Sequence, residues 1–263
     1  MRLLKLIIPV IGKPLCRIIN DCLEQGIFPD ELKIAIVTPI YKKGAIDQFE
    51  NYRPISVLPA SSKLFETLLK NRLASFLEHN SILHYFQHGF RKQRSTITAM
   101  VEVLDTIFEA FNEDEEVVLS CIDLSKAFDS VCHDILLSKL RSYGIRGKAH
   151  DIFKSYLTQR YQAVKWNNAV SKMREVTVGV PQGSVLGPIL FIIFTNDLYK
   201  NLRTDKLCGY ADDTAFINKA KTRDTLNMKS ASSLADAVRW FKSNGLLLNP
   251  DKTQNLIFTN KEK

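Results

Sequence analysis

Two adjacent aspartates, Asp212 and Asp213, place the strongest constraint on how this sequence folds. They stand between a short run at 206–208 and an apolar run at 215–217, a pattern that indicates a β-hairpin with both carboxylates at its turn. Neighbouring carboxylates repel each other, and the cost rises where the flanking strands are buried. Taken alone, the pair also suits a solvated turn. The alternative is a site for a hard divalent cation, because Mg²⁺ and Mn²⁺ prefer carboxylate oxygens.

A third aspartate, Asp123, directly follows an apolar run at 117–122. This run is short enough to be a buried strand, and ligands in open sheets gather beyond the ends of strands. If this strand neighbours the hairpin, the three carboxylates meet at one edge of the sheet. They could then hold two metal ions about 3.5–4 Å apart, the spacing used for in-line phosphoryl transfer.

The composition is that of a soluble globular protein with a basic surplus. Hydrophobic residues make up 45% and charged residues 24% of the 263 positions, which is enough for one large domain or two interleaved ones. Lysine and arginine outnumber aspartate and glutamate by 36 to 28, and the resulting net charge of +8 suits a polyanionic partner.

The cysteines and the apolar runs indicate an intracellular protein, in the nucleus or the cytoplasm. The odd number of cysteines and the lack of CxxC pairing argue against a disulfide framework. The N-terminal run resembles a signal peptide only faintly, because Lys5 and Pro9 interrupt it and no small-residue cleavage site follows. No run approaches the roughly 18 apolar residues of a membrane span, so we expect no membrane partner. The cysteines are Cys16, Cys22, Cys121, Cys132 and Cys208.

Hydrophobic periodicity and turn residues predict an α+β fold without internal repeats or a clear linker. The predicted helices lie at 14–24, 64–76, 97–111, 134–143, 148–157, 186–198 and 226–241. The predicted strands lie at 33–41, 117–122, 161–166, 174–180, 206–208, 215–217, 246–248 and 255–258. We interpret Asp134 as a helix cap.

Six motifs in order carry a resemblance to a known family. They are Asn-Tyr-Arg-Pro-Ile-Ser at 51–56, Gln-His-Gly-Phe-Arg at 87–91, Asp-Leu-Ser-Lys-Ala-Phe-Asp at 123–129, Pro-Gln-Gly-Ser-Val-Leu-Gly-Pro at 181–188, Tyr-Ala-Asp-Asp at 210–213 and Leu-Asn-Pro-Asp-Lys-Thr at 248–253. Over nearly its whole length the chain resembles the reverse transcriptase domain of non-LTR retrotransposons, close to the jockey and CR1-like lineages. Each motif alone is weak, and the specificity comes from their order.

The resemblance implies a right-hand polymerase with fingers and palm, in which the palm is a ferredoxin-like antiparallel sheet backed by helices. We expect this chain to lack the family's thumb, which would follow Thr253, and its endonuclease, which would precede Met1. The implied parts are fingers at 1–95, palm at 96–130, a connection between fingers and palm at 131–181, and palm again at 182–263.

The resemblance also implies a reaction, the RNA-directed synthesis of DNA from an RNA template, a DNA primer and deoxynucleoside triphosphates. Asp123, Asp212 and Asp213 would bind two Mg²⁺ ions, with Mn²⁺ as a substitute. One ion would acidify the primer 3′-hydroxyl, and the other would gather the incoming triphosphate. Lys252 would donate a proton to the leaving pyrophosphate, although an ordinary loop lysine is an equal alternative.

Other residues match family positions that contact the nucleotide. Lys42 and Arg53 would hold the triphosphate through cationic donors, with Lys43 as an alternative to Lys42. Gln182 would contact the nucleotide or the template from a loop that Pro181 stiffens.

Two further residues of these motifs, Gly183 and Phe128, would determine how the nucleotide fits. Gly183 would let the backbone of the loop approach the nucleotide closely. Phe128 would be a steric gate that excludes a 2′-hydroxyl by overlap, and a plain core phenylalanine is the alternative.

The basic loop of the second motif would contact the template. Arg91, Lys92 and Arg94 are placed to bind its phosphate backbone, a contact that weakens steeply with salt.

Two other functions stay open. A truncated, non-catalytic remnant that only binds nucleic acid fits the expected lack of a thumb, whereas the intact aspartates argue against it. An RNA polymerase of related palm architecture is disfavoured by Phe128, because a polar residue that binds ribose is expected there. Nothing in the sequence indicates an oligomeric state.

Overall fold

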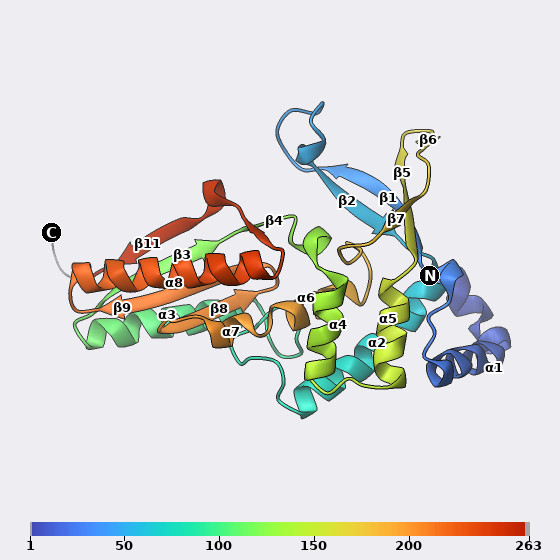
Figure 1. Ribbon diagram of the computed structural model, residues 1–263, viewed down its shortest axis with the longest axis horizontal. Helices are drawn as coiled ribbons and strands as arrows, with labels where there is room; N and C mark the ends of the chain where they lie inside the picture. The colour runs from blue at the N-terminus through green and yellow to red at the C-terminus, as the bar shows by residue number, and fades with distance from the viewer. Residues whose placement is uncertain (1, 261–263) are drawn as a thin grey trace. The chain divides into compact units, whose positions relative to one another are not determined.

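The computed structural model describes residues 2–260 and divides the chain into two compact units. Unit 1 comprises Met1–Ser75 and Cys132–Gly187, and unit 2 comprises Phe76–Val131 and Pro188–Lys263. Each unit therefore combines two separate stretches of sequence, which is the interleaved arrangement that the length allowed (Figure 1). Helices and strands occur in both units, and the predicted α+β class is confirmed. The names fingers and palm stay predictions.

Unit 1 combines helices with a mixed sheet. Strand order is β2-β1-β5-β6, and β7 also pairs with β5. The first strand runs antiparallel to β2 and parallel to β5. The helices are α1 (Arg2–Gln25), α2 (Ala60–His79), α4 (His133–Ser142) and α5 (Lys148–Leu157), with the short 3₁₀ helices η1 (Asp30–Leu32) and η2 (Phe49–Asn51). The strands are β1 (Ile34–Tyr41), β2 (Tyr52–Val57), β5 (Arg160–Trp166), β6 (Ala169–Val170) and β7 (Arg174–Val176).

Aromatic residues form the centre of unit 1. Phe28, Phe65 and Tyr156 are all buried. The ring of Phe28 stacks on that of Phe65 and meets the edge of Tyr156, with centroid distances of 5.1 Å in both pairs. Large rings remove much apolar surface from water, so this cluster joins the segment between α1 and η1 to helices α2 and α5.

Unit 2 is built on an antiparallel sheet with the strand order β11-β3-β9-β8. A separate two-stranded ladder pairs β10 with β4. The strands are β3 (Glu116–Ile122), β4 (Leu124–Ser125), β8 (Lys206–Tyr210), β9 (Asp213–Ala220), β10 (Leu247–Leu248) and β11 (Gln254–Phe258). The helices are α3 (Thr96–Asn112), α6 (Gly187–Thr195), α7 (Leu198–Asn201) and α8 (Arg223–Ser243), with η3 (Ala127–Ser130) and η4 (Pro250–Lys252).

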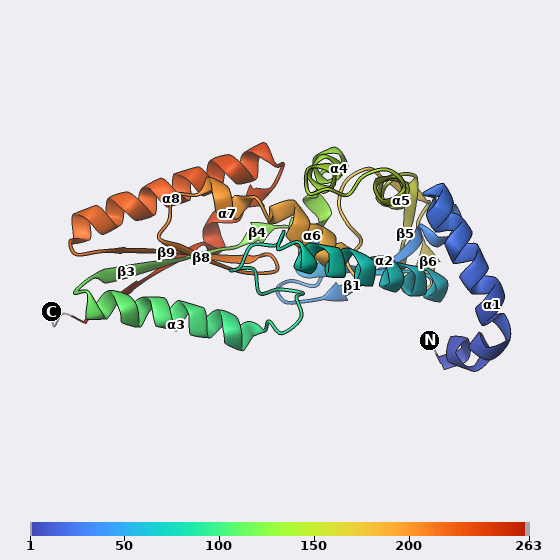
Figure 2. The same cartoon turned by 90° about the horizontal axis from the view of Figure 1, so that it is seen from below.

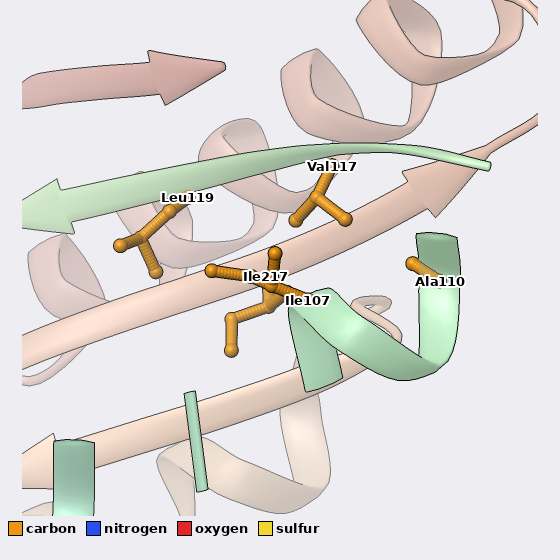
Figure 3. Close-up of a cluster of buried hydrophobic side chains, with 5 residues drawn as sticks. All are labelled: Ile107, Ala110, Val117, Leu119 and Ile217. Atoms are coloured by element: carbon orange, nitrogen blue, oxygen red, sulfur yellow. The ribbon is translucent and has the colours of Figure 1, made fainter. Parts of the chain in front are cut away.

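Helices cover both faces of this sheet (Figure 2). On one face, Val117 and Leu119 of β3 pack with Ile217 of β9 and with Ile107 and Ala110 of α3 (Figure 3). On the other face, Val118 and Ala220 pack with Leu226 of α8. Alternate side chains of a strand point to opposite faces, so β3 needs apolar residues on both. This explains why its sequence is mostly apolar rather than alternating, with Ser120 as the one polar residue after Glu116.

Several local predictions differ from the structure. Strand β2 was not predicted, the strand predicted at 174–180 ends at Val176, and the helix predicted at 186–198 is divided into α6 and α7. Helix α1 begins at Arg2, whereas the sequence predicted a start at Pro14, because proline favours the first turn of a helix. The cap assigned to Asp134 is wrong, since α4 begins at His133 and Asp134 lies inside its first turn. A negative charge there is still favourable toward the helix dipole. None of the described helices is both long enough and apolar enough to cross a membrane.

Candidate functional site

The three aspartates come to one end of the sheet of unit 2, as the sequence predicted. Strand β3 ends at Ile122, which pairs with Thr214 of β9, so Asp123 and Asp213 continue from paired positions at the same end. Asp212 lies in the two-residue turn between β8 and β9, where Tyr210 pairs with Asp213. The carboxylates are thus held by two neighbouring strands of one sheet.

Negative charge accumulates at this end of the sheet. Asp213 is exposed on one side, but partial burial raises the pKa of its carboxyl, and the charges of Asp212 and Asp123 raise it further. A bound cation would compensate this accumulated negative charge.

A lysine supplies part of this compensation. The Lys252 Nζ lies 2.9 Å from the Asp123 Oδ2, with the lysine half exposed and the aspartate one-third exposed. The backbone fixes the pair, because the Asn249 N–H donates to the Asp123 carbonyl and β10 pairs with β4 directly beyond it. An ion pair this open to solvent holds the two groups only weakly.

The donor chemistry of the three aspartates fits a hard divalent cation, since all the ligands offered are carboxylate oxygens. Among residues 2–260, His, Cys, Asp and Glu side chains form no group of three or more that could hold a metal ion as they stand. The fit therefore rests on the kind of donors and on the uncompensated charge at Asp213.

Phe128 is half-buried beside this site. It lies in η3 and its ring stacks on Phe191 of α6, with centroids 4.7 Å apart and an angle of 24° between the planes. The contact fixes the ring while leaving part of its surface exposed. This arrangement is compatible with both of the roles that the sequence suggested, a steric gate or a packed phenylalanine.

Four of the five predicted nucleotide-binding residues lie in unit 1, and the fifth, Phe128, lies in unit 2. The loop that carries Gln182 and Gly183 docks on strand β2, where the Ser56 N–H donates to the Gln182 carbonyl at 2.7 Å. Gly183 has φ +111°, and a Cβ at this position would come within 2.7 Å of the Ser56 carbonyl oxygen. Only glycine therefore permits this approach. Arg53 belongs to the same strand, pairs with Ile40 and is exposed.

Lys42 follows the end of β1 directly. Its backbone N–H donates to the Asn51 carbonyl at 2.8 Å, which ties it to the strand that carries Arg53. Its side chain is exposed, as is that of Lys43. The structure thus brings Lys42, Arg53 and the loop of Gln182 to one sheet, while the aspartates, Lys252 and Phe128 belong to unit 2.

Comparison with known proteins decides which family this is. The family described as reverse transcriptase (RNA-dependent DNA polymerase) matches residues 40–262. The chain belongs to the reverse transcriptase family. This confirms the resemblance that the six motifs indicated.

Two relatives of this chain come from mobile elements. It is 36% identical over 253 residues to the probable RNA-directed DNA polymerase from transposon BS of Drosophila melanogaster, covering 93% of this chain and 28% of the relative. It is 31% identical over 255 residues to the RNA-directed DNA polymerase from mobile element jockey of the same species, covering 94% and 28%. The chain thus spans little more than a quarter of the length of these relatives.

Solved structures share its fold. The structure of apo telomerase from Candida tropicalis truncated from its C-terminal domain matches with a TM-score of 0.63 at 15% identity, over 90% of this chain and 52% of that chain. A telomerase from Candida albicans in complex with a fragment of telomeric RNA matches with a TM-score of 0.64 at 14% identity, over 88% and 43%. At this identity the likeness shows the fold of the reverse transcriptase chain.

The basic loop of this reverse transcriptase is partly committed to internal contacts. The guanidinium of Arg91 donates two hydrogen bonds to Glu78, at 2.8 and 2.7 Å, and a third to the His84 carbonyl at 2.7 Å. The hydrogen bond from Arg91 lowers the pKa of the Glu78 carboxyl. Lys92 is exposed, and the guanidinium of Arg94 lies 4.3 Å from the centre of the Tyr85 ring.

Sequence reasoning missed one buried carboxylate of the reverse transcriptase fold. Glu66 of α2 is fully buried, and its Oε2 accepts hydrogen bonds from the backbone N–H groups of Val185 and Leu186 at 2.7 and 3.0 Å. Ser62 donates to its other oxygen at 3.0 Å. Glu66 thereby holds the end of the loop that carries Gln182. The sequence signal that could have indicated this buried carboxylate is a charged residue directly after Phe65, on a predicted amphipathic helix.

Proposed function

We propose that this chain provides the fingers and palm of an RNA-directed DNA polymerase of a non-LTR retrotransposon, and that it adds deoxynucleotides to a primer 3′-hydroxyl. The supporting observation is the convergence of Asp123, Asp212 and Asp213 at one end of a sheet, in a chain of the reverse transcriptase family. Unit 1 corresponds to the fingers and unit 2 to the palm, whose antiparallel sheet would be of the ferredoxin-like type.

The aspartates would hold two Mg²⁺ ions, with Mn²⁺ as a substitute. When bound, these ions acidify the primer hydroxyl and neutralise charge on the triphosphate and the leaving pyrophosphate. The chain's own contribution is position. Strand β3 fixes Asp123, and the β8–β9 hairpin fixes Asp212 and Asp213. Ligands that are set in place before the substrate arrives need no reorganisation during the reaction.

Lys252 has two roles under this proposal. Before the metals bind, its ammonium compensates the charge of Asp123 at 2.9 Å. If bound cations took over that task, the ammonium would be available to give a proton to the leaving pyrophosphate.

The fingers would hold the incoming nucleotide. Lys42 and Arg53 bring cationic donors to the triphosphate, and the planar guanidinium of Arg53 suits two phosphate oxygens at once. Gln182 contacts the nucleotide or the template from a loop that docks closely because Gly183 has no side chain. Phe128 would exclude a 2′-hydroxyl, and Lys92 and Arg94, together with Arg91, would contact the template.

One experiment tests the polymerase proposal. Purified chain is incubated with a DNA primer annealed to an RNA template, deoxynucleoside triphosphates and Mg²⁺ at low salt, and extension is followed on a gel. The wild type should extend the primer, and Asp212→Asn should abolish extension while the far-UV circular dichroism is unchanged. Asp105→Asn removes the same charge from an exposed position of α3 and should extend the primer like the wild type.

The same assay separates the second candidate function, nucleic-acid binding without catalysis. The observation that favours it is the net charge of +8, which attracts a polyanion whether or not catalysis follows. Salt-sensitive RNA binding without extension by the wild type would establish this function instead. Near-normal extension by Asp212→Asn would contradict the assignment of the metal ligands.

A further inference from the structure

The motif at 87–91 lies directly beside the turn that carries the catalytic aspartates. Gln87 forms a parallel bridge with Gly209 of β8. The His88 N–H donates to the Gly209 carbonyl at 2.7 Å, and the Gly209 N–H donates to the Phe86 carbonyl at 3.0 Å. This segment therefore extends the sheet of unit 2 by a short piece of backbone at the end where Asp212 and Asp213 stand.

The side chain of Gln87 points into this junction and is only 2% exposed. Its Oε1 accepts hydrogen bonds from the N–H of Gly89 at 2.7 Å and from the N–H of Ala211 at 3.3 Å. Its Nε2 donates to the hydroxyl of Tyr199 at 3.2 Å. One buried amide thus connects its own loop to the residue that precedes Asp212, and a buried amide with several partners has a defined orientation.

The hydrogen bond from Ala211 to Gln87 matters because the backbone of Ala211 has an unfavourable conformation. Ala211 is the first of the two turn residues and has φ +62°, in the left-handed region. Hairpin turns of this kind favour glycine at that position, and a residue with a Cβ costs about 1–2 kcal/mol there. Such a conformation persists only where its surroundings hold it. The hydrogen bond from Ala211 to Gln87 is a contact of this kind.

The packing around the turn is close at two glycines. A Cβ on Gly89 would overlap the backbone nitrogen of Ala211, and a Cβ on Gly209 would overlap the Tyr199 hydroxyl. Gly89 therefore allows the two backbones to approach, and Gly209 leaves room for the Tyr199 side chain that contacts Gln87. Burial raises the pKa of the Tyr199 hydroxyl, which keeps it neutral and available to Gln87.

We propose that Gln87 is a positioning residue that holds the turn of Asp212 and Asp213 in the shape that catalysis needs. The proposal rests on the proposed polymerase function, in which these two carboxylates are metal ligands. It gives Gln87 a task distinct from the template contacts assigned to the basic residues of the same motif. A ligand that moves by about 1 Å costs an enzyme on the order of a hundredfold in rate, so the turn's shape has catalytic consequences.

The test compares two substitutions that each remove contacts of the same side chain. Gln87→Met keeps the length of the side chain but removes both hydrogen bonds to backbone N–H groups. Tyr199→Phe removes only the bond to the Nε2 and leaves the Oε1 contacts in place. A purely structural role predicts that both variants lose stability and that neither changes the kinetics of the folded enzyme.

The positioning role predicts a different result. For Gln87→Met, kcat for nucleotide addition should fall roughly tenfold, which corresponds to about one lost hydrogen bond, while KM for the nucleotide and the Kd for primer–template stay unchanged. Hydrogen exchange measured without metal should be faster in the peptide that covers 209–214. For Tyr199→Phe, kcat and the exchange of this peptide should stay close to the wild type.

The readouts separate the two proposals from each other. If the wild type adds no nucleotide, the polymerase function fails, and the exchange of 209–214 still shows whether Gln87 holds the turn. Unchanged kcat and unchanged exchange in Gln87→Met would overturn the positioning role, as would equal effects in both variants. If Gln87→Met does not fold, Gln87→Asn is used, because its shorter side chain stays polar but does not reach Ala211.

Discussion

At the scale of single residues, the position of Phe128 is set by Phe191 beneath it. A ring held in this way excludes a 2′-hydroxyl better than a mobile one, because the overlap cannot be relieved by rotation. The same contact would give Phe128 a purely structural role if no nucleotide approached it. The two roles differ in what the loss of the ring does to substrate choice.

We expect Phe128→Ala to admit ribonucleotides. The ratio of kcat/KM for a ribonucleotide to that for its deoxynucleotide should rise by roughly 10 to 200 times, the range that one steric group commands in a pocket. Single-nucleotide addition with matched triphosphates measures the ratio. Phe108→Ala removes an equal ring from the exposed side of α3 and should leave the ratio unchanged. Unchanged discrimination in Phe128→Ala would leave only the packing role.

At the scale of elements, Glu66 joins helix α2 to the loop that precedes α6. Its carboxylate accepts from the N–H groups of Val185 and Leu186, which lie just before α6 and need acceptors because they are at least partly buried. The oxygen of a buried carboxylate is a strong acceptor, so the loop that carries Gln182 is tied to the core of unit 1.

We expect Glu66→Ala to lower the free energy of unfolding by about 3 kcal/mol, because two buried N–H groups lose their acceptor. Urea denaturation followed by circular dichroism measures this change. Glu66→Gln keeps one oxygen acceptor of the same size and should cost clearly less. The role assigned to Glu66 would be wrong if both substitutions lowered the free energy of unfolding by the same amount.

The hairpin and the long-range hydrogen bonds of Gln87 and Glu66 differ in how far the sequence alone could predict them. The hairpin at Asp212 and Asp213 has a local signal, two runs of strand residues around a short turn, and its strands were predicted correctly. The bond between Gln87 and Ala211 joins positions 124 apart, and that between Glu66 and Val185 joins positions 119 apart. Contacts of this kind depend on tertiary pairing and leave no periodic pattern in the sequence.

For the same reason, the sequence predicted that the three aspartates lie together only on the condition that their strands are neighbours. Apolar residues at 117–122 predict a buried strand, but not which strand lies beside it. The register of β3 with β9 supplies the missing step, since Ile122 pairs with Thr214. The six ordered motifs identified the family without this geometry, because their order does not depend on knowing any contact.

At the scale of the whole molecule, charge determines how the chain meets a polyanion. The surplus of eight positive charges attracts any nucleic acid, but a residue that contacts phosphate also releases a counterion when it binds. Of the three basic residues predicted to contact the template, Arg91 donates hydrogen bonds to Glu78 and His84, whereas the side chain of Lys92 is exposed. A substitution of Lys92 can therefore distinguish a direct contact with phosphate from the general attraction of a positive chain.

We expect Lys92→Gln to change the salt dependence of binding to a single-stranded RNA template. The slope of log K against log salt should become shallower by about 0.7, the share of one phosphate contact on a single strand. Fluorescence anisotropy of labelled RNA across a salt series measures the slope. Lys242→Gln removes the same charge from an exposed position of α8 and should weaken binding only slightly, with no change in slope. Equal slopes in the wild type and both variants would mean that net charge alone accounts for the attraction, and that the loop after the Gln87 motif does not contact the template.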